Sequence, residues 1–397
     1  MHTFVTRLVP AAVAALFLLL PVSAHAQAAA PAPQAAVVPA KAAALDPAAL
    51  EQKVDELLKA HISVNDFSGT ILLAREGRPL VMKGYGFANR EWQIPNTAET
   101  KFRIGSVTKQ FTSMIVMQLR EQGKLKLEDS VCSFVSPCPD AWKPVTVHHL
   151  LTHTSGIPSY TGIAAWREIN MMPKTTDQMM AIFRDLPLQW VPGEKYAYNN
   201  SGYFLLGVVI EKVTGKKYEQ ALQEMVLTPL GLKDTGYDWP RTIIARRAAG
   251  YEGRGANIRN ADALDMQQPY SAGSMYSTVL DLLKWEQALY TDTLLPVAAK
   301  QIMWTPFRND YAYGWIVAPA SATMFGGHRR FAHGGGINGF SAMIVRLPEP
   351  RMTAIVLSNN DAASASNVAR DIMAIYYGHP YDVPAPRAVV KVDPGIK

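Results

Sequence analysis

The chain reads Phe102-Arg103-Ile104-Gly105-Ser106-Val107-Thr108-Lys109-Gln110-Phe111 at the point where an apolar helical spacing begins. A serine hydroxyl is a poor nucleophile until a base takes its proton. Lys109 follows Ser106 by three residues, so on a helix the two side chains share one face. The stretch therefore predicts a serine nucleophile with a lysine beside it, although Ser106 could instead serve only as a helix N-cap.

Four further segments accompany this pair. Tyr198-Asn199-Asn200 and His333-Gly334-Gly335-Gly336 follow it along the chain, and Val147–Pro158 (VHHLLTHTSGIP) and Ser271–Thr278 (SAGSMYST) lie between them. In this order the motifs resemble the serine β-lactamase-like superfamily. The similarity runs from about Asp66 to Tyr376. It is strongest to the branch that holds class C β-lactamases, penicillin-binding-protein-like esterases, D-aminopeptidases and DD-peptidases.

The resemblance implies a role for each motif. Lys109 would be a neutral base, and Tyr198 a second proton carrier with a pKa lowered by the nearby lysine. Asn200 would accept from Lys109 and donate to a substrate carbonyl. The glycine run would let an extended substrate lie beside Gly335, with the N–H of Gly336 and that of the serine binding the oxyanion. The alternative for Tyr198 is a tyrosine that only packs in the core, and the alternative for the glycine run is a plain loop.

His333 stands where many β-lactamases have lysine. An imidazole with its ordinary pKa near 6.5 is only partly charged at neutral pH, so it binds a carboxylate less firmly than lysine does. We therefore expect ester hydrolysis to exceed β-lactam hydrolysis, and recognition of carboxylates to strengthen as the pH falls. Three other histidines, His148, His149 and His153, are expected to be structural.

Apolar periodicity and turn residues predict an α/β (α+β) fold. Helices are expected from Asp46-Pro47, from Ser106 to about Gly123, at Tyr203–Val213, Thr278–Tyr290 and Ala362–Tyr376, and strands at Gly69–Arg75, Leu80–Phe87, Tyr313–Val317, Gly339–Arg346 and Thr353–Ser358. Strands at both chain ends predict one antiparallel sheet flanked by helices, with an all-helical lobe inserted between its halves. The expected divisions are a signal peptide at 1–26, an Ala/Pro linker at 27–45, a hydrolase domain at 46–378 (sheet lobe 46–105 and 300–378, helical lobe 106–299) and a Pro-rich tail at 379–397.

The N-terminus has the pattern of a secretory signal. Arg7 precedes the apolar stretch Val9–Leu20, and Ala24-His25-Ala26 is a small-x-small cleavage site. The apolar stretch is too short to span a membrane, so the sequence predicts an exported protein, periplasmic or secreted, with no membrane anchor. In such a compartment Cys132 and Cys138, the two cysteines of the chain, could form a disulfide rather than remain two free thiols.

Several function classes find no support. The formal net charge is +6, but the basic residues are scattered, so the sequence indicates no nucleic-acid partner. It contains neither a zinc-spaced cysteine or histidine set nor a glycine-rich nucleotide motif, so no cofactor or metal is expected.

These observations favour an exported serine hydrolase that acts through an acyl-enzyme on a small ester, amide or peptide, as an esterase or D-amino-acid peptidase. The alternatives are a true class C-like β-lactamase or DD-carboxypeptidase, and, from another class, a non-catalytic relative that binds wall fragments.

Overall fold

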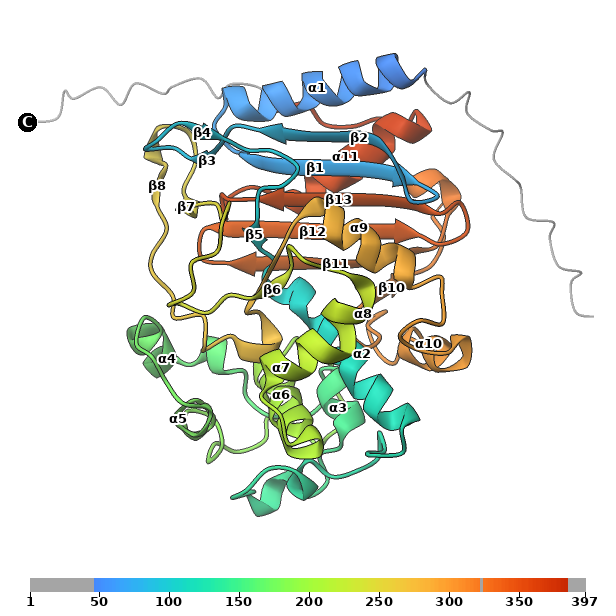
Figure 1. Ribbon diagram of the computed structural model, residues 1–397. Helices are drawn as coiled ribbons and strands as arrows, with labels where there is room; N and C mark the ends of the chain where they lie inside the picture. The colour runs from blue at the N-terminus through green and yellow to red at the C-terminus, as the bar shows by residue number, and fades with distance from the viewer. Residues whose placement is uncertain (1–45, 322–323, 385–397) are drawn as a thin grey trace, which may run out of the picture. The chain divides into compact units, whose positions relative to one another are not determined.

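The computed structural model describes residues 46–321 and 324–384 (Figure 1). The predicted signal peptide and Ala/Pro linker, residues 1–45, lie outside the described part, as does most of the predicted tail. Within the described part no helix has the length and apolar character needed to cross a bilayer.

A six-stranded antiparallel sheet brings the two ends of the chain together. Its strand order is β10-β11-β12-β13-β1-β2, where the strands are β1 Gly69–Arg75, β2 Arg78–Tyr85, β10 Ile316–Ala318, β11 Arg330–Ile337, β12 Phe340–Leu347 and β13 Met352–Ser358. β1 pairs with β13 along its whole length, from Gly69 opposite Ser358 to Arg75 opposite Met352. The predicted antiparallel sheet assembled from both chain ends is therefore confirmed.

Two terminal helices cover one face of this sheet. α1 (Pro47–Ser63) and α11 (Ala365–Tyr377) pack on it, and β1 contributes Ile71 and Leu73 to the same core. α1 starts with Pro at its first position, as predicted, but Asp46 makes no side-chain cap bond. The alternating residues Leu72 and Ala74 of β1 belong to a larger core on the opposite face, as the two-residue period of a strand requires.

Most of the helices pack around the larger core. These are α2 Thr108–Glu121, α3 Val147–Leu151, α4 Ala164–Ile169, α5 Thr176–Ala181, α6 Asn200–Thr214, α7 Tyr218–Leu222, α8 Thr228–Leu230, α9 Val279–Ala288 and α10 Val297–Met303. α2 and α6 are buried over most of their length. α9 packs directly on β1 and β13, where Glu286 pairs with the buried Arg346 of β12 at 3.1 Å.

The structure also differs from the sequence-based expectation in places. The inserted segment is not helical throughout. Within it β9 (Met275–Ser277) pairs with β6 (Gly236–Tyr237) on one side and with β5 (Phe102–Arg103) on the other, and β7 (Tyr251–Glu252) pairs with β8 (Arg259–Asn260). The strand expected to reach Phe87 ends at Tyr85, since Gly86 has φ +64°; β3 (Phe87–Asn89) then pairs with β4 (Ile94–Pro95). β11 was not among the predicted strands, because three glycines lower its β propensity.

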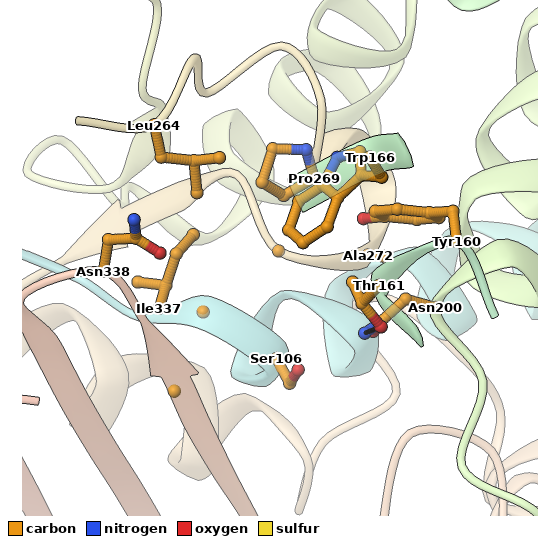
Figure 2. Close-up of a pocket in the computed structure, with 13 residues that line it drawn as sticks. Ser106, Tyr160, Thr161, Trp166, Asn200, Leu264, Pro269, Ala272, Ile337 and Asn338 are labelled. Atoms are coloured by element: carbon orange, nitrogen blue, oxygen red, sulfur yellow. Dashed lines mark hydrogen bonds between the residues drawn. The ribbon is translucent and has the colours of Figure 1, made fainter. Parts of the chain in front are cut away.

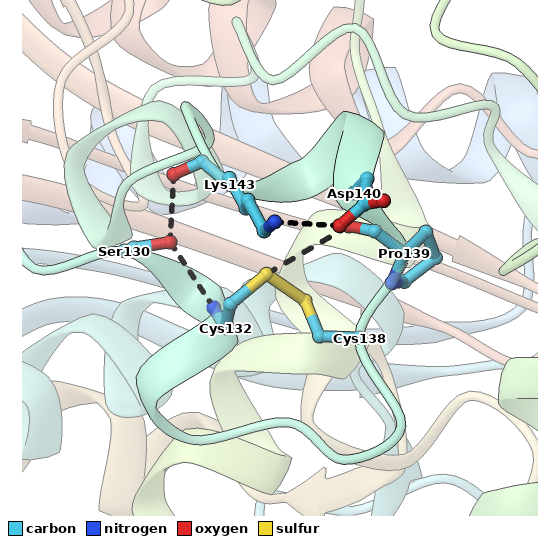
Figure 3. Close-up of a disulfide and its surroundings, with 6 residues drawn as sticks. All are labelled: Ser130, Cys132, Cys138, Pro139, Asp140 and Lys143. Carbon is cyan, nitrogen blue, oxygen red and sulfur yellow. Dashed lines mark hydrogen bonds and ion pairs between the residues drawn. A yellow bond between two sulfur atoms is a disulfide. The ribbon is translucent and has the colours of Figure 1, made fainter.

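Cys132 and Cys138 form a disulfide in the segment between α2 and α3 (Figure 3). The small loop is held by further contacts. Ser130 Oγ donates to the Lys143 carbonyl at 2.8 Å, and Lys143 pairs with Asp140 at 2.6 Å. None of these residues lines a cavity next to Ser106, so the bridge lies outside the candidate site.

Candidate active site

Ser106 lies in a 3-10 turn, Gly105–Val107, directly before α2. Neither this turn nor α2 has a side-chain cap bond at its start, so the hydroxyl is not used as an N-cap. β11 runs against the turn: a Cβ on Gly335 would lie 1.9 Å from the Ile104 carbonyl oxygen, and one on Gly105 would lie 3.0 Å from Gly336 N. Only glycine permits this approach, which brings the backbone of β11 to the serine.

Lys109 is fully buried and makes three polar contacts. Its Nζ lies 2.9 Å from Ser106 Oγ, 2.8 Å from Asn200 Oδ1 and 2.8 Å from the Ala272 carbonyl oxygen. No carboxylate is among its partners in the described part of the chain. Burial without a counter-charge lowers the pKa of Lys109 well below its usual value.

The three contacts fit a neutral amine. Asn200 Oδ1 and the Ala272 carbonyl can only accept, so they take the two N–H groups. The remaining position around the nitrogen, its lone pair, then faces Ser106 Oγ, which can donate its own proton. Lys109 is therefore placed and poised to take the proton of the serine.

Tyr198 lies next to both Ser106 and Lys109. Lys109 Nζ is 4.9 Å from the centre of its ring. Desolvation raises the pKa of the Tyr198 phenol above its usual value, and its contact with Ser106 only partly offsets this. The expectation of a lowered phenol pKa is therefore wrong: the side chain is neutral and carries a proton that it can donate.

His153 holds the segment that carries Tyr198. Its carbonyl accepts from the N–H of Ala197 at 3.1 Å, and its Nδ1 accepts from the N–H of Asn199 at 3.0 Å. The imidazole also packs on the Tyr198 ring, with centroids 4.4 Å apart. Contacts before, at and after the tyrosine make His153 a positioning residue for it. In contrast, His148 bonds to the hydroxyl of Tyr313.

Asn200 is the first residue of α6, and its side chain spans the site. Oδ1 accepts from Lys109, as expected, while Nδ2 donates to Thr161 Oγ1 at 3.2 Å. Its backbone N–H donates to Ser159 Oγ at 3.1 Å. The amide is thus fixed in one orientation, with its nitrogen toward a cavity that it lines.

His333 is buried rather than available as a cation. Its Nδ1 bonds to the Gly334 carbonyl at 2.6 Å, so Nδ1 carries the proton, and Nε2 accepts from the hydroxyl of Tyr311 at 2.9 Å. Burial, with a further contribution from nearby Lys109, lowers the pKa of His333 to about 3. The expectation of a partly charged imidazole near pH 6.5 is therefore wrong.

The free edge of β11 supplies backbone donors. β11 pairs with β10 only as far as Ala332, so the edge beyond it is free of β10. Ile337 closes the hairpin opposite Phe340 of β12, and alternate residues of a strand direct their N–H groups to opposite edges. The N–H of Gly336 therefore points away from β12, and it lines both cavities next to Ser106.

Ser106 borders two cavities. The first, which we call the Trp166 cavity, has about 110 Å³ and is drawn in Figure 2; its lining includes Tyr160, Trp166, Pro269 and Ile337. The second, the Tyr311 cavity, has about 410 Å³, and its lining includes Tyr196, Tyr198, Tyr311, Ile316 and His333. The nucleophile thus has separate space for the two halves of a substrate.

Sequence reasoning missed three members of this site. The Ala272 carbonyl holds Lys109, Tyr311 holds His333, and Trp166 walls one cavity. Only Ala272 had a signal, since it lies in the motif-like segment Ser271–Thr278. Among the described residues no group of acidic, histidine or cysteine side chains could hold a metal ion.

Comparison with known proteins gives consistent matches. A family model described as beta-lactamase matches residues 51–376. Penicillin-binding protein 4* of Bacillus subtilis is 30% identical over 343 residues, which cover 81% of this chain and 74% of that protein. The octameric penicillin-binding protein homologue from Pyrococcus abyssi superposes with a TM-score of 0.70 at 30% identity, covering 84% of this chain and 78% of its own. A D-stereospecific amidohydrolase from Streptomyces sp. superposes with a TM-score of 0.68 at 26% identity, covering 83% and 99%.

Proposed function

Because this chain belongs to the beta-lactamase family, a family of serine hydrolases, we propose that it hydrolyses an ester or amide through an acyl-enzyme on Ser106. One observation carries the proposal: the buried Nζ of Lys109 lies 2.9 Å from Ser106 Oγ, and its two other partners are the acceptors Asn200 Oδ1 and the Ala272 carbonyl. A surface or cap serine has no need of such a neighbour.

The reaction follows from these positions. The Ser106 proton moves to Lys109 Nζ while Oγ bonds to the substrate carbonyl carbon, and the backbone N–H groups of Ser106 and Gly336 stabilise the oxyanion. As the bond to the leaving group breaks, neutral Tyr198 gives its proton to the departing oxygen or nitrogen and takes one from the protonated lysine. A water molecule then attacks the acyl carbon, which releases the acid and restores the serine.

The surroundings of His333 support a neutral leaving group. Among the described residues that line the Tyr311 cavity, none carries a formal charge, and His333 itself is uncharged. A carboxylate there would lose water without gaining a counter-charge. This favours esters and neutral amides over β-lactams and the substrates of DD-carboxypeptidases. The similarity to a D-stereospecific amidohydrolase keeps amides among the candidates.

We also propose that the protein acts after export, on the basis of Arg7, Val9–Leu20 and Ala24-His25-Ala26. N-terminal sequencing of protein recovered from the periplasm or medium tests this. A mature N-terminus near residue 27 supports export, and retention of Met1 in the cytoplasm contradicts it.

Ser106→Ala tests the chemistry. We expect labelling by a fluorophosphonate to disappear and nitrophenyl ester turnover to fall by a factor on the order of 10⁴ or more, without loss of fold. Ser113→Ala is the matched control, since Ser113 is a buried serine of the helix that follows Ser106, α2, and its hydroxyl bonds to Tyr203 at 3.1 Å. Turnover by Ser106→Ala within tenfold of wild type would overturn the proposal. A folded wild type that neither labels nor turns over would instead favour a wall-fragment-binding protein.

A further inference from the structure

The two cavities beside Ser106 differ in which half of the substrate they can hold. Tyr198 lines the Tyr311 cavity and is absent from the Trp166 cavity. Since Tyr198 is the proton donor in the proposed reaction, the leaving atom lies on its side. The acyl half of the substrate must then enter the Trp166 cavity.

The walls of the Trp166 cavity combine rings and aliphatic groups with the neutral polar side chains of Thr161, Asn200 and Asn338. The apolar part is formed by Tyr160, Trp166, Leu264, Pro269 and Ile337, which converge on one space in Figure 2. The lining residues in the described part of the chain include no charged side chain. An acyl group with a free α-ammonium would therefore lose its hydration without meeting a carboxylate.

The cavity is also small. Its volume of about 110 Å³ is well below the roughly 300–1,000 Å³ of most small-molecule sites. It therefore has room for a short acyl chain only. The Tyr311 cavity, at about 410 Å³, leaves room for a much larger leaving group.

Trp166 forms one wall of this cavity, and its side chain is held in place although its helix is not buried. α4, which carries it, has no buried residue. Gln268 supplies the missing attachment: its Oε1 accepts from Trp166 Nε1 at 2.7 Å, and its Nε2 donates to the carbonyls of Ile169 at 3.0 Å and Met172 at 2.6 Å. Gln268 is fully buried, and the Trp166 ring meets Tyr160 edge to face at 5.3 Å.

We propose that the Trp166 cavity is the acyl site for short, uncharged, apolar acyl groups, and that Trp166, fixed by Gln268, sets the length limit. This inference rests on the proposed function. It narrows the substrate class to esters or amides that are uncharged on both sides of the scissile bond.

The test is an acyl-length series of nitrophenyl esters: acetate, butyrate, hexanoate and octanoate, with the nitrophenyl ester of D-alanine as the charged analogue of short length. In wild type we expect kcat/KM to fall tenfold or more from butyrate to octanoate, since even one methylene misplaced in an apolar pocket changes the rate constant by about 10-fold or more. D-alanine ester should be a poorer substrate than butyrate. Trp166→Ala should raise the octanoate-to-butyrate ratio at least tenfold, and Trp166→Phe, which keeps a ring, should raise it less.

Trp92→Ala is the matched control, because Trp92 is 80% exposed and lines neither cavity; its ratio should equal that of wild type. Fluorophosphonate labelling of Ser106 distinguishes a failure of the acyl-site assignment from a failure of the proposed function. A labelled Trp166→Ala protein with the wild-type length profile, or a wild type that prefers octanoate or the D-alanine ester, overturns the acyl-site assignment alone. A wild type that neither labels nor turns over any ester overturns the proposed function and the acyl site with it.

Discussion

Lys109 and Arg346 are both basic side chains removed from water, and their surroundings differ in kind. Lys109 has only neutral partners, whereas Arg346 pairs with the equally buried Glu286 at 3.1 Å and lies among the rings of Tyr290 and Trp304. A guanidinium cannot shed its proton in a protein, so burying it requires a carboxylate. A lysine can, so burial alone turns it into a base.

The difference shows that residue type and surroundings together decide whether a buried basic side chain stabilises the fold or takes part in the chemistry. The paired arginine attaches α9 to the sheet and gains nothing by titrating. The unpaired lysine contributes no ion pair to stability, but it holds a lone pair ready beside a hydroxyl. The following changes test this contrast, beginning with the largest effect.

Replacing Lys109 with methionine should reduce kcat/KM for an ester by about 10²–10⁴-fold, the range that general-base catalysis contributes. The fold should survive, because no counter-ion is left unpaired. Lys109→Arg sharpens the contrast, since arginine stays charged and should be both inactive and less stable. Ester kinetics and thermal unfolding measure the two effects. A Lys109→Met protein within tenfold of wild-type activity would show that the lysine is not the base.

Glu286→Ala removes the carboxylate beside Arg346 and should lower the free energy of unfolding by ~3–5 kcal/mol, as expected for a buried charge left unpaired. The specific activity of the folded fraction should not change. Glu76→Gln is the control: it breaks an exposed pair with Arg75, which is worth at most ~1 kcal/mol. Urea unfolding of both variants gives the comparison. Equal losses would mean that burial does not distinguish the pairs.

Most of the sheet could be predicted from sequence. Gly69–Arg75 is a continuous apolar run and forms β1 with the predicted bounds, because residues buried on both faces leave a strong signal. β11 left none: its glycines are required by backbone contact with Gly105 and Ile104, and that contact is made by residues more than two hundred positions away. Glycine motifs of this kind are visible only through a family resemblance.

The candidate site likewise contains residues that could be predicted from sequence and residues that could not. Ser106 and Lys109 are local neighbours on one helical turn, so their contact could be predicted from spacing. The Ala272 carbonyl has no side-chain signature, and the surroundings of Tyr198 and His333 depend on how distant segments pack. The lowered pKa expected for the Tyr198 phenol was wrong for that reason, because desolvation there outweighs the hydrogen bond to Ser106. The ordinary pKa expected for His333 was wrong because burial and the nearby Lys109 both lower it.

The Cys132–Cys138 disulfide lies in a part of the molecule that contacts neither Lys109 nor Arg346. Cys132→Ser should lower stability by less than the ~3 kcal/mol expected for a longer loop, because only six positions separate the two cysteines. Ester kcat/KM should be unchanged. Thermal unfolding with and without reductant, alongside kinetics, checks both. A large loss of activity at constant fold would mean that this loop reaches the site after all.

His153 is, like Lys109, a buried group kept neutral: burial lowers its pKa well below the usual value. Its Nδ1 accepts from the N–H of Asn199, so His153→Leu should lower kcat by up to about tenfold, the value of one hydrogen bond of ~0.5–1.5 kcal/mol, with little change in KM. His153→Asn retains an acceptor and should recover part of the loss. Equal kcat for both variants and wild type would show that Tyr198 is positioned without this bond.

His333 gives the smallest expected effect, and a decisive one. With its pKa lowered to about 3 by burial, it is neutral throughout pH 5.5–8. The ratio of kcat/KM for a neutral ester to that for a cephalosporin should then be constant over this range. Each rate alone should fall as the pH drops through the pKa of Lys109, because protonation removes the base, but this loss is common to both substrates and cancels in the ratio. His333→Gln keeps an acceptor for Tyr311 and should leave the ratio equally flat.

The opposite outcome is a rise of cephalosporin hydrolysis relative to ester hydrolysis as the pH falls through ~6.5, the ordinary histidine value. If this rise occurs in wild type but not in His333→Gln, it would show that His333 is hydrated and charged in the working enzyme. It would then belong with Arg346 as a retained cation rather than with Lys109 as a neutralised one.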